Sequence, residues 1–339
     1  MDLLSWTPKN LKIMMKWEKI GKIFDPRDYE LSCGCTQFAK SPQAYFFDNS
    51  VRIFFSSCFL DKTGKYLSHV CYVDFSKDFQ NLKNTNKAQV VPLGELGAFD
   101  EHGVFPIHIY QQQNELWGYT TGWSRRVSVS AESAIGLVVS RNNGQTFEKF
   151  GKGPIMGASL HEPFLVADPF VLLVGEVFHM WYISGKRWIF SSEATQAERV
   201  YKISHAISSD GIHWKKDNRF IVPDSIGPDE CQALPSVLEV DGIYHMVFCY
   251  RDAIGFRTEA GKGYRLGYAY SKDLMNWTRD DQVLGLELTG EGWDGQMMCY
   301  PHLFRLDGRI ALLYNGNNFG KEGFGLAILG SHINEHIKS

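Results

Sequence analysis

The chain has 339 residues, of which 44% are hydrophobic, 14% aromatic and 22% charged, and this composition excludes an intrinsically disordered protein. Its formal net charge is −3 without a block of like charges, which argues against a nucleic-acid-binding protein, whose affinity would depend on a dense basic face. No apolar run approaches the roughly 18 to 20 residues that a membrane span needs. Residues 1–8 have an acidic second residue and lack the apolar core of a signal peptide, so we expect a cytoplasmic protein.

The seven cysteines are an odd number scattered mostly through apolar segments. Only Cys33 and Cys35 are closely spaced, and one C-x-C pair without a second pair is a weak sign of a metal site. We therefore expect buried free thiols and no metal ion. The sequence also lacks a Walker-type loop and a G-x-G-x-x-G motif, so no nucleotide or other cofactor is predicted.

A unit of about 65 residues repeats along the chain. Its clearest sign is the pattern Ala-x-Ser-x-Asp-x-x-x-Trp, complete at 206–214 and 269–277 and degraded at 76–82 and 140–147. The last residue of each copy is an apolar or aromatic anchor, and the successive anchors are almost evenly spaced: Leu82, Phe147, Trp214 and Trp277. One more step of the same length back from Leu82 reaches Trp17, which predicts a fifth anchor there.

Between the anchors lie a proline, an apolar run, a turn and a second apolar run. The prolines recur at nearly the same interval as the anchors: Pro42, Pro106, Pro169, Pro235 and Pro301. Asp241-Gly242 and Asp307-Gly308 separate two such pairs of runs, and Asp-Gly in this context is a strong β-hairpin signal. A third strand follows each hairpin, and a fourth begins at the anchor.

Four strands in each of five units predict an all-β fold, a five-bladed β-propeller that forms a single domain over residues 1–339. We place the blades at roughly 25–82, 83–147, 148–214, 215–277 and 278–330, with 10–24 supplying the last strand of the last blade. Closing the ring with the strand around Trp17 protects strand edges that would otherwise be exposed. Two unrelated β-sandwich domains are the alternative.

Loops that enter the innermost strands of a propeller meet on one face, and here these loops carry many acids. The candidate catalytic carboxylates are Asp100, Glu162, Asp168, Glu230 and Asp294. Cleavage of a glycosidic bond needs one protonated and one ionised carboxyl group, and crowding separates their pKa values. Each acid alone is also typical of turn capping. Asp168 stands out, because the repeat-equivalent residues are Ser41, Phe105, Leu234 and Tyr300, and Glu162 is likewise unmatched.

A second group of polar and aromatic residues follows the second strand of several units or adjoins the acids. The candidate substrate-binding residues are Glu101, His161, Trp123, Arg187, Trp188, Arg251, Tyr300, Asn315 and Asn317. Trp faces stack on sugar rings, whereas Arg and Asn bind hydroxyl, phosphate or carboxylate groups. Ordinary surface loops are the alternative interpretation of these positions.

These motifs resemble the glycoside hydrolase superfamily that contains arabinanases, β-xylosidases, invertases and mannoside phosphorylases. The resemblance covers about residues 17–330 and is carried by segments such as 99–106, 161–163, 180–188, 250–251, 264–269, 293–294 and 314–317. They are similar to stand-alone bacterial propellers of surface-polysaccharide loci and to the N-terminal domain of plant glucosamine inositolphosphorylceramide transferases. The resemblance implies an all-β propeller that acts on or binds a carbohydrate.

One departure from the arabinanase-like pattern bears on the activity. Those enzymes place an Asp directly before the proline of the first blade, where this sequence has Ser41 before Pro42. Three functions therefore stay open: an enzyme that cleaves or transfers a glycosyl unit of a surface polysaccharide, a non-catalytic glycan-binding or scaffold propeller, and a glycoside phosphorylase in which Arg187 and Arg251 hold phosphate. Each has a carbohydrate partner, and none involves nucleic acid or a membrane span.

Overall fold

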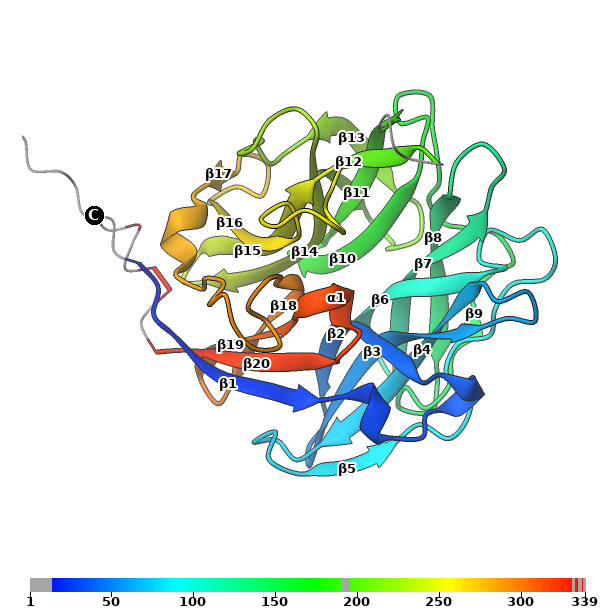
Figure 1. Ribbon diagram of the computed structural model, residues 1–339, viewed down its shortest axis with the longest axis horizontal. Coiled ribbons are helices and arrows are strands. Elements are labelled where there is room, and N and C mark those ends of the chain that lie inside the picture. The colour runs from blue at the N-terminus through cyan, green and yellow to red at the C-terminus, as the bar shows by residue number, and fades with distance from the viewer. Residues whose placement is uncertain (1–13, 191–195, 331–332, 335–336, 338–339) are drawn as a thin grey trace, which may run out of the picture.

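A computed structural model describes residues 14–190, 196–330, 333–334 and 337 (Figure 1). The acidic start of the sequence, at 1–8, lies outside the described residues, as do 9–13, which include part of the segment predicted to end the last blade. Nearly all of the regular structure in the described residues is strand, as predicted, with short 3-10 helices and one four-residue helical turn, α1 (Asn317–Gly320), in which Asn318 and Phe319 have positive φ. Among the described residues, no helix has the length and apolar character that a bilayer crossing demands.

The strands form antiparallel groups in chain order. Two four-stranded sheets contain β10 (Val166–Val174), β11 (Val177–Ile189), β12 (Glu198–Ser208) and β13 (Lys215–Phe220), and β14 (Glu230–Val240), β15 (Ile243–Asp252), β16 (Arg265–Ser271) and β17 (Thr278–Arg279). An eight-stranded sheet contains β2 (Gln37–Phe46), β3 (Val51–Leu60), β4 (Tyr66–Phe75), β5 (Leu82–Thr85), β6 (Gly103–Gln112), β7 (Glu115–Arg125), β8 (Ala131–Ser140) and β9 (Glu148–Lys149). Its two halves, β2–β5 and β6–β9, are joined by one parallel bridge between Ser68 and Gly103.

The remaining four-stranded sheet combines segments from the two ends of the sequence. It contains β18 (Cys299–Leu306), β19 (Arg309–Asn315), β20 (Phe324–Leu329) and β1 (Trp17–Phe24). Trp17 pairs with Leu329 and Phe24 with Phe324, and the Trp17 indole donates a hydrogen bond to the Leu284 carbonyl at 2.8 Å. The predicted pairing of the Trp17 segment with the last strands is therefore confirmed.

The proline-bearing strands gather at the centre of the molecule (Figure 1). β2 contacts β6, β6 contacts β10, β10 contacts β14, β14 contacts β18, and β18 contacts β2. The pairing register of each strand shifts at its proline, and the residue before the proline has a positive φ in four of them: Ser41, Asp168, Leu234 and Tyr300. The fold therefore repeats one bulge on its innermost strands.

The repeated Ser/Asp motif closes the turn before the fourth strand. The Asp210 carboxylate accepts hydrogen bonds from the backbone of Ile212 and His213, both at 2.8 Å, and from the Ser208 hydroxyl at 2.9 Å. Asp273 accepts the same set from Met275, Asn276 and Ser271. Because each carboxylate captures free backbone donors, the motif sets the direction in which the outer strand begins.

Candidate active site

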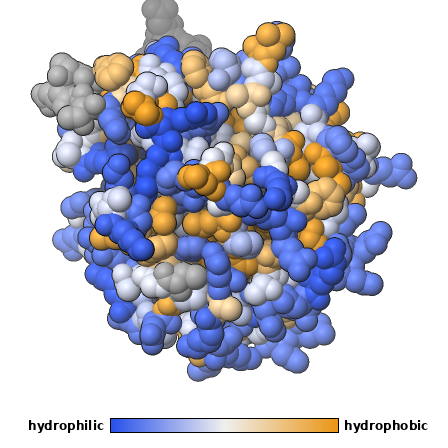
Figure 2. All heavy atoms as spheres, turned by 90° about the vertical axis from the view of Figure 1, so that its right-hand side faces the viewer, coloured by the Kyte–Doolittle hydropathy of each residue, from blue (hydrophilic) through white to orange (hydrophobic). Residues whose placement is uncertain are grey.

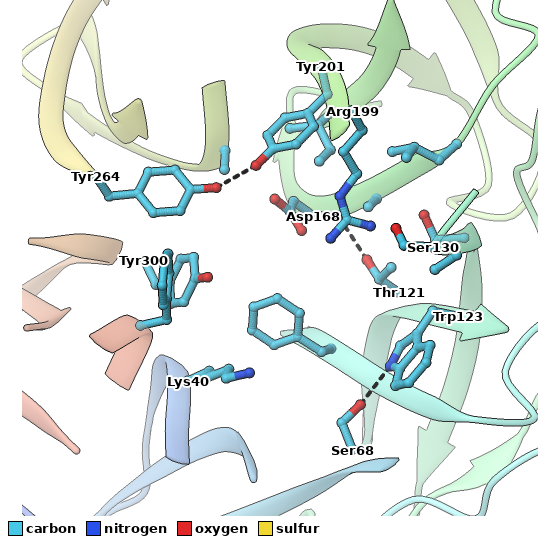
Figure 3. A pocket seen from close by; sticks show the side chains of 18 of the residues that line it. Lys40, Ser68, Thr121, Trp123, Ser130, Asp168, Arg199, Tyr201, Tyr264 and Tyr300 are labelled. Carbon is cyan, nitrogen blue, oxygen red and sulfur yellow. Dashed lines mark hydrogen bonds between the residues drawn. The ribbon is translucent and has the colours of Figure 1, made fainter. Parts of the chain in front are cut away.

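The inner strands surround a cavity of about 590 Å³ (Figure 3). This volume is within the range of small-molecule sites, roughly 300 to 1,000 Å³. Residues from β2 through to α1 line it: Phe38, Lys40, Cys58, Tyr66, Ser68, Phe105, Thr121, Trp123, Ser130, Ala131, Ser133, Leu165, Ala167, Asp168, Ile183, Arg199, Tyr201, Ala233, Arg251, Phe256, Arg257, Tyr264, Tyr300 and Phe319. In this lining, Asp168 is the one carboxylate that the described residues contribute.

Asp168 lies on β10 at the bulge, with φ 56°. Asp is one of the few side chains that tolerate this left-handed region well, so the bulge suits an Asp and turns it into the cavity. Its backbone N–H donates to the Thr121 hydroxyl at 2.8 Å, and its Oδ2 accepts from the Leu234 N–H at 3.2 Å. Burial raises the pKa of Asp168 to about 7, and the Leu234 N–H and the charge of Arg199 only partly offset this rise.

The cavity lining is rich in cations. Arg257 pairs with Glu198, but for Lys40, Arg199 and Arg251 no carboxylate oxygen of the described residues lies within 4.0 Å of the charged nitrogens. Arg251 is 2% exposed, its Nη2 donates to the Tyr201 hydroxyl at 2.9 Å, and its buried Nε has no hydrogen-bond partner. Figure 3 shows Arg199 beside Asp168 and Lys40 on the other side of the cavity. A buried cation without a counter-ion favours an anionic ligand.

The other four predicted carboxylates do not line the cavity. Each forms an ion pair with a basic residue on the fourth strand of a group: Asp100 with Lys149 at 2.5 Å, Glu162 with Lys216 at 2.7 Å, Glu230 with Arg279 at 2.5 Å, and Asp294 with Lys19 at 2.9 Å. Glu162 and Asp294 also accept hydrogen bonds from buried tyrosine hydroxyls, Tyr182 and Tyr314. The four carboxylates therefore hold the outer strands to the segments that enter the inner ones.

Of the nine predicted substrate-binding residues, three line the cavity: Trp123, Arg251 and Tyr300. The Trp123 indole is held by a 2.7 Å hydrogen bond to the Ser68 hydroxyl, which fixes the plane of the ring. Elsewhere, His161 is exposed, Trp188 packs against the apolar core, and Arg187 pairs with Asp229 at the surface. Glu101 accepts a hydrogen bond from the Gly97 N–H at 3.0 Å.

Asn315 and Asn317 organise loops instead of lining the cavity. The Asn315 amide donates to the carbonyls of Ala39 and Gly323, both at 2.7 Å, and accepts from the Ser41 N–H at 2.8 Å. Asn317 accepts from the backbone of 296 and 297, at 2.9 Å each. These amides fix the backbone on both sides of α1.

Several lining residues were not among the predicted site residues, above all Lys40, Arg199, Tyr201 and Tyr264. The sequence does contain a signal for the structural carboxylates, because a basic residue stands two positions after four of the anchors: Lys19, Lys149, Lys216 and Arg279. If these four basic residues are interpreted as ion-pair partners of four carboxylates, Asp168 is the remaining candidate for a catalytic role. For Lys40 and Arg199 we find no comparable signal.

Comparison with known proteins gives relatives over nearly the whole chain and others over about a third of it. No protein-family model matches the chain. The Mycobacterium tuberculosis protein named Uncharacterized protein MT1551 is 30% identical over 317 residues, which is 93% of this chain and 99% of that protein. A 1,2-beta-oligomannan phosphorylase from Thermoanaerobacter sp. is 26% identical over 110 residues, 32% of this chain and 34% of the phosphorylase.

Solved structures of similar fold cover nearly the whole sequence at low identity. They are a glycoside hydrolase (TM-score 0.70, 15% identity, 93% of this protein and 92% of that one), a thermostable family-43 glycoside hydrolase (0.60, 12%, 86% and 88%) and the β-1,2-mannobiose phosphorylase of Listeria innocua in complex with β-1,2-mannobiose (0.64, 11%, 93% and 96%). The shared fold is that of glycoside hydrolase-like β-propellers.

Proposed function

This protein belongs to the same family as the M. tuberculosis protein MT1551, within the glycoside hydrolase-like β-propellers, and we propose that it is a carbohydrate-active enzyme that transfers a glycosyl unit to phosphate. The observation that carries this proposal is the charge of the cavity lining, which among the described residues has one carboxylate and three cations, Lys40, Arg199 and Arg251, with no carboxylate oxygen within 4.0 Å. The names of similar proteins, which include β-mannoside phosphorylases, point in the same direction.

The number of carboxylates distinguishes phosphorolysis from hydrolysis. Hydrolysis with either stereochemical outcome uses one carboxyl group as acid and a second as base or nucleophile. Phosphate is already an anionic nucleophile and needs no second carboxylate to activate it. A cavity with Asp168 alone, lined by Lys40, Arg199 and Arg251, therefore suits phosphorolysis better than hydrolysis.

In the proposed reaction, Asp168 is the general acid. With a pKa of about 7 it carries its proton in a large fraction of molecules at neutral pH. The proton passes to the glycosidic oxygen as the bond between that oxygen and the anomeric carbon breaks. An oxygen of hydrogen phosphate bonds to the anomeric carbon, giving a glycosyl phosphate and a free hydroxyl on the leaving group. The phosphate proton then restores Asp168, so the reaction balances.

The cations would hold phosphate through charge-assisted hydrogen bonds. Arg251 is suited to this role, because its Nε lacks a partner and its guanidinium is fixed by Tyr201 and by the ring of Phe256, whose centroid lies 3.4 Å away. Arg187, which the sequence analysis also offered for phosphate, pairs with Asp229 and is not part of the cavity lining. Trp123 would support the sugar ring.

We propose in addition that the strand groups are five blades of one closed propeller domain. The cycle of contacts among β2, β6, β10, β14 and β18 supports this arrangement, as does the pairing of β1 with β20. A cytoplasmic location, where phosphate and sugar phosphates are abundant, fits the same function.

The test is product analysis with a panel of oligosaccharides that includes β-1,2-mannobiose, with and without inorganic phosphate. We expect a sugar 1-phosphate that forms only with phosphate present and is lost in Asp168→Asn. Free sugar formed at equal rates without phosphate would identify a hydrolase. Glycan binding without any product would identify a non-catalytic propeller.

A further inference from the structure

The wall of the cavity is divided into a polar and an aromatic part. Hydroxyl groups line one part: Ser68, Thr121, Ser130 and Ser133. The other part is a run of aromatic rings in edge contact, with centroid distances of 5.4 Å (Phe105–Tyr300), 5.6 Å (Tyr300–Tyr264), 6.1 Å (Tyr264–Phe319) and 5.9 Å (Phe319–Phe256). Phe38 adds a further ring, in edge contact with Tyr66 at 5.8 Å. Lys40 Nζ lies 4.2 Å from the ring centroid of Phe38, and Arg251 Cζ lies 3.4 Å from that of Phe256, so these two rings also contact cations of the lining. Phe319 adds apolar surface beside them.

Two of these phenylalanines have strained backbones. Phe38 has φ 68° and Phe319 has φ 59°, and Asn318 before it has φ 57°. A bulky side chain rarely adopts the left-handed region, and such strain tends to gather at ligand sites. Phe79 has a similar φ of 60° but is 5% exposed and packs in the core against Phe304 and others. Phe38 and Phe319 are half-buried and line the cavity, and Phe319 also packs against the edge of the apolar core.

One side chain holds both strained segments in place. The Asn315 amide donates to the Ala39 carbonyl, next to Phe38, and to the Gly323 carbonyl that follows α1, while it accepts from the Ser41 N–H. β2 and α1 are therefore fixed relative to one another, and each presents a phenylalanine to the cavity. The strained rings are preorganised, which lowers the entropy lost when they close on a ligand.

We infer that Phe38 and Phe319 are specificity-determining residues that receive an apolar group, aryl or alkyl, attached next to the anion or sugar of the substrate. This inference rests on the proposed function and names its substrate class: a glycoside whose leaving group is apolar, not a second sugar. The polar part of the wall takes the glycosyl unit, Asp168 protonates the bridging oxygen, and the aromatic part takes the departing group.

The test uses probes that need no knowledge of the sugar. Calorimetric titration compares inorganic phosphate with phenyl phosphate and hexyl phosphate, in the wild type, Phe38→Gly and Phe319→Gly. In the wild type we expect an apolar substituent to tighten binding by about 10-fold or more. In either variant the gain should fall below about threefold. Because Lys40 Nζ lies 4.2 Å from the centroid of the Phe38 ring, each gain is measured relative to the affinity of the same variant for inorganic phosphate. The ratio of the phenyl to the hexyl gain distinguishes an aryl from an alkyl group.

Thermal unfolding separates a binding role from a structural one. Glycine relieves the strain at a positive φ, so Phe38→Gly and Phe319→Gly should keep or raise the melting temperature. Phe79→Gly is the matched control, because the same backbone relief there is outweighed by lost core packing, and its melting temperature should fall by several degrees. An equal fall in all three variants would make the rings core residues and overturn the inference.

The two proposals fail in different ways. If phosphate binds, but neither the substituted phosphates nor phenyl β-D-mannopyranoside binds more tightly than inorganic phosphate and methyl β-D-mannopyranoside, the apolar specificity is wrong and phosphorolysis is untouched. If phosphate does not bind, phosphorolysis is wrong, and phenyl β-D-mannopyranoside against methyl β-D-mannopyranoside then decides the apolar inference. Equal affinity for these two, or binding of neither, overturns it.

Discussion

Glu230 and Asp168 begin from similar positions and end in opposite electrostatic states. Both carboxylates are buried on inner strands, at 1% and 6% exposure. Glu230 pairs with the Arg279 guanidinium at 2.5 Å and accepts hydrogen bonds from the backbone N–H groups of Ser225 and Ile226. Burial alone would raise the pKa of Glu230, but these partners outweigh it and hold the pKa below its ordinary value. Asp168 has one N–H, from Leu234, and its pKa rises to about 7. A paired carboxylate stabilises a sheet, whereas an unpaired one can move a proton.

Removing the partner of Glu230 should have the largest effect on stability. Arg279→Ala leaves a buried carboxylate without its cation, and we expect a loss of about 3 to 5 kcal/mol in the free energy of unfolding, measured by urea denaturation. Phosphorolysis per folded molecule should be unchanged. A loss below about 1 kcal/mol would mean that Glu230 needs no cation, and the contrast with Asp168 would disappear.

Asp168→Asn should reduce activity strongly instead of destabilising the fold. The amide keeps the shape but cannot donate an acidic proton, so turnover should fall by at least about 10²-fold. At about pH 4, where Asp168 is protonated in the folded protein, the free energy of unfolding should stay within about 1 kcal/mol, because no ion pair is broken. Unaltered turnover in the Asn variant would exclude Asp168 as the acid.

The pH profile should report the raised pKa of Asp168. A general acid is active when protonated, so turnover should fall about tenfold per pH unit above pH 7. Arg199 stabilises the ionised form of Asp168, and therefore Arg199→Gln should move this limb of the turnover profile to higher pH.

The raised pKa of Asp168 should also make the free energy of unfolding depend on pH, in the direction opposite to that of a salt-bridged Asp. The folded-state pKa exceeds the unfolded value of 3.8, so ionisation costs stability as the pH rises from about 4 to 7, and Asp168→Asn should gain relative stability over that range.

Arg251→Ala should weaken phosphate binding by roughly 1 to 3 kcal/mol, the range for a hydrogen bond to a charged group. Calorimetric titration with inorganic phosphate measures it. Arg251→Lys retains the charge without the planar donors and should recover only part of the loss. Wild-type affinity in Arg251→Ala would remove Arg251 from the anion site.

Arg187→Ala should have the smallest effect. Arg187 and Asp229 are 42% and 50% exposed, and such surface pairs contribute little, so we expect a change within about 0.5 kcal/mol in unfolding and none in phosphate affinity. A larger effect on affinity would return Arg187 to the site.

Repetition made most of the fold predictable. The Asp241-Gly242 hairpin is present with φ values of 52° and 78°, as Asp-Gly predicts, and the spacing of anchors located β1 although its partner strand is at the far end of the sequence. The departure from repetition selected two carboxylates, of which Asp168 lines the cavity and Glu162 pairs with Lys216 outside it.

The rest of the site could not be predicted, since strand pattern gives the position of a residue but not the direction of its side chain. The bulge before each proline interrupts the alternation of faces, and it decides that Phe105, Asp168 and Tyr300 reach the cavity. Long side chains such as Arg199 reach it from outside the motifs. The sequence also suggested catalytic roles for Asp100 and Glu162, because their ion-pair partners, Lys149 and Lys216, are about 50 residues further along the chain and only the structure brings them together.

The pairing of β1 with β20 also has a consequence for synthesis on the ribosome. Lys19 leaves the ribosome early, but its partner Asp294 is made 275 residues later. At roughly 5 to 20 residues per second, β1 waits on the order of tens of seconds for the strands it will join. Throughout that interval β1 lacks β20, so the strand edge that β20 covers in the folded protein stays open.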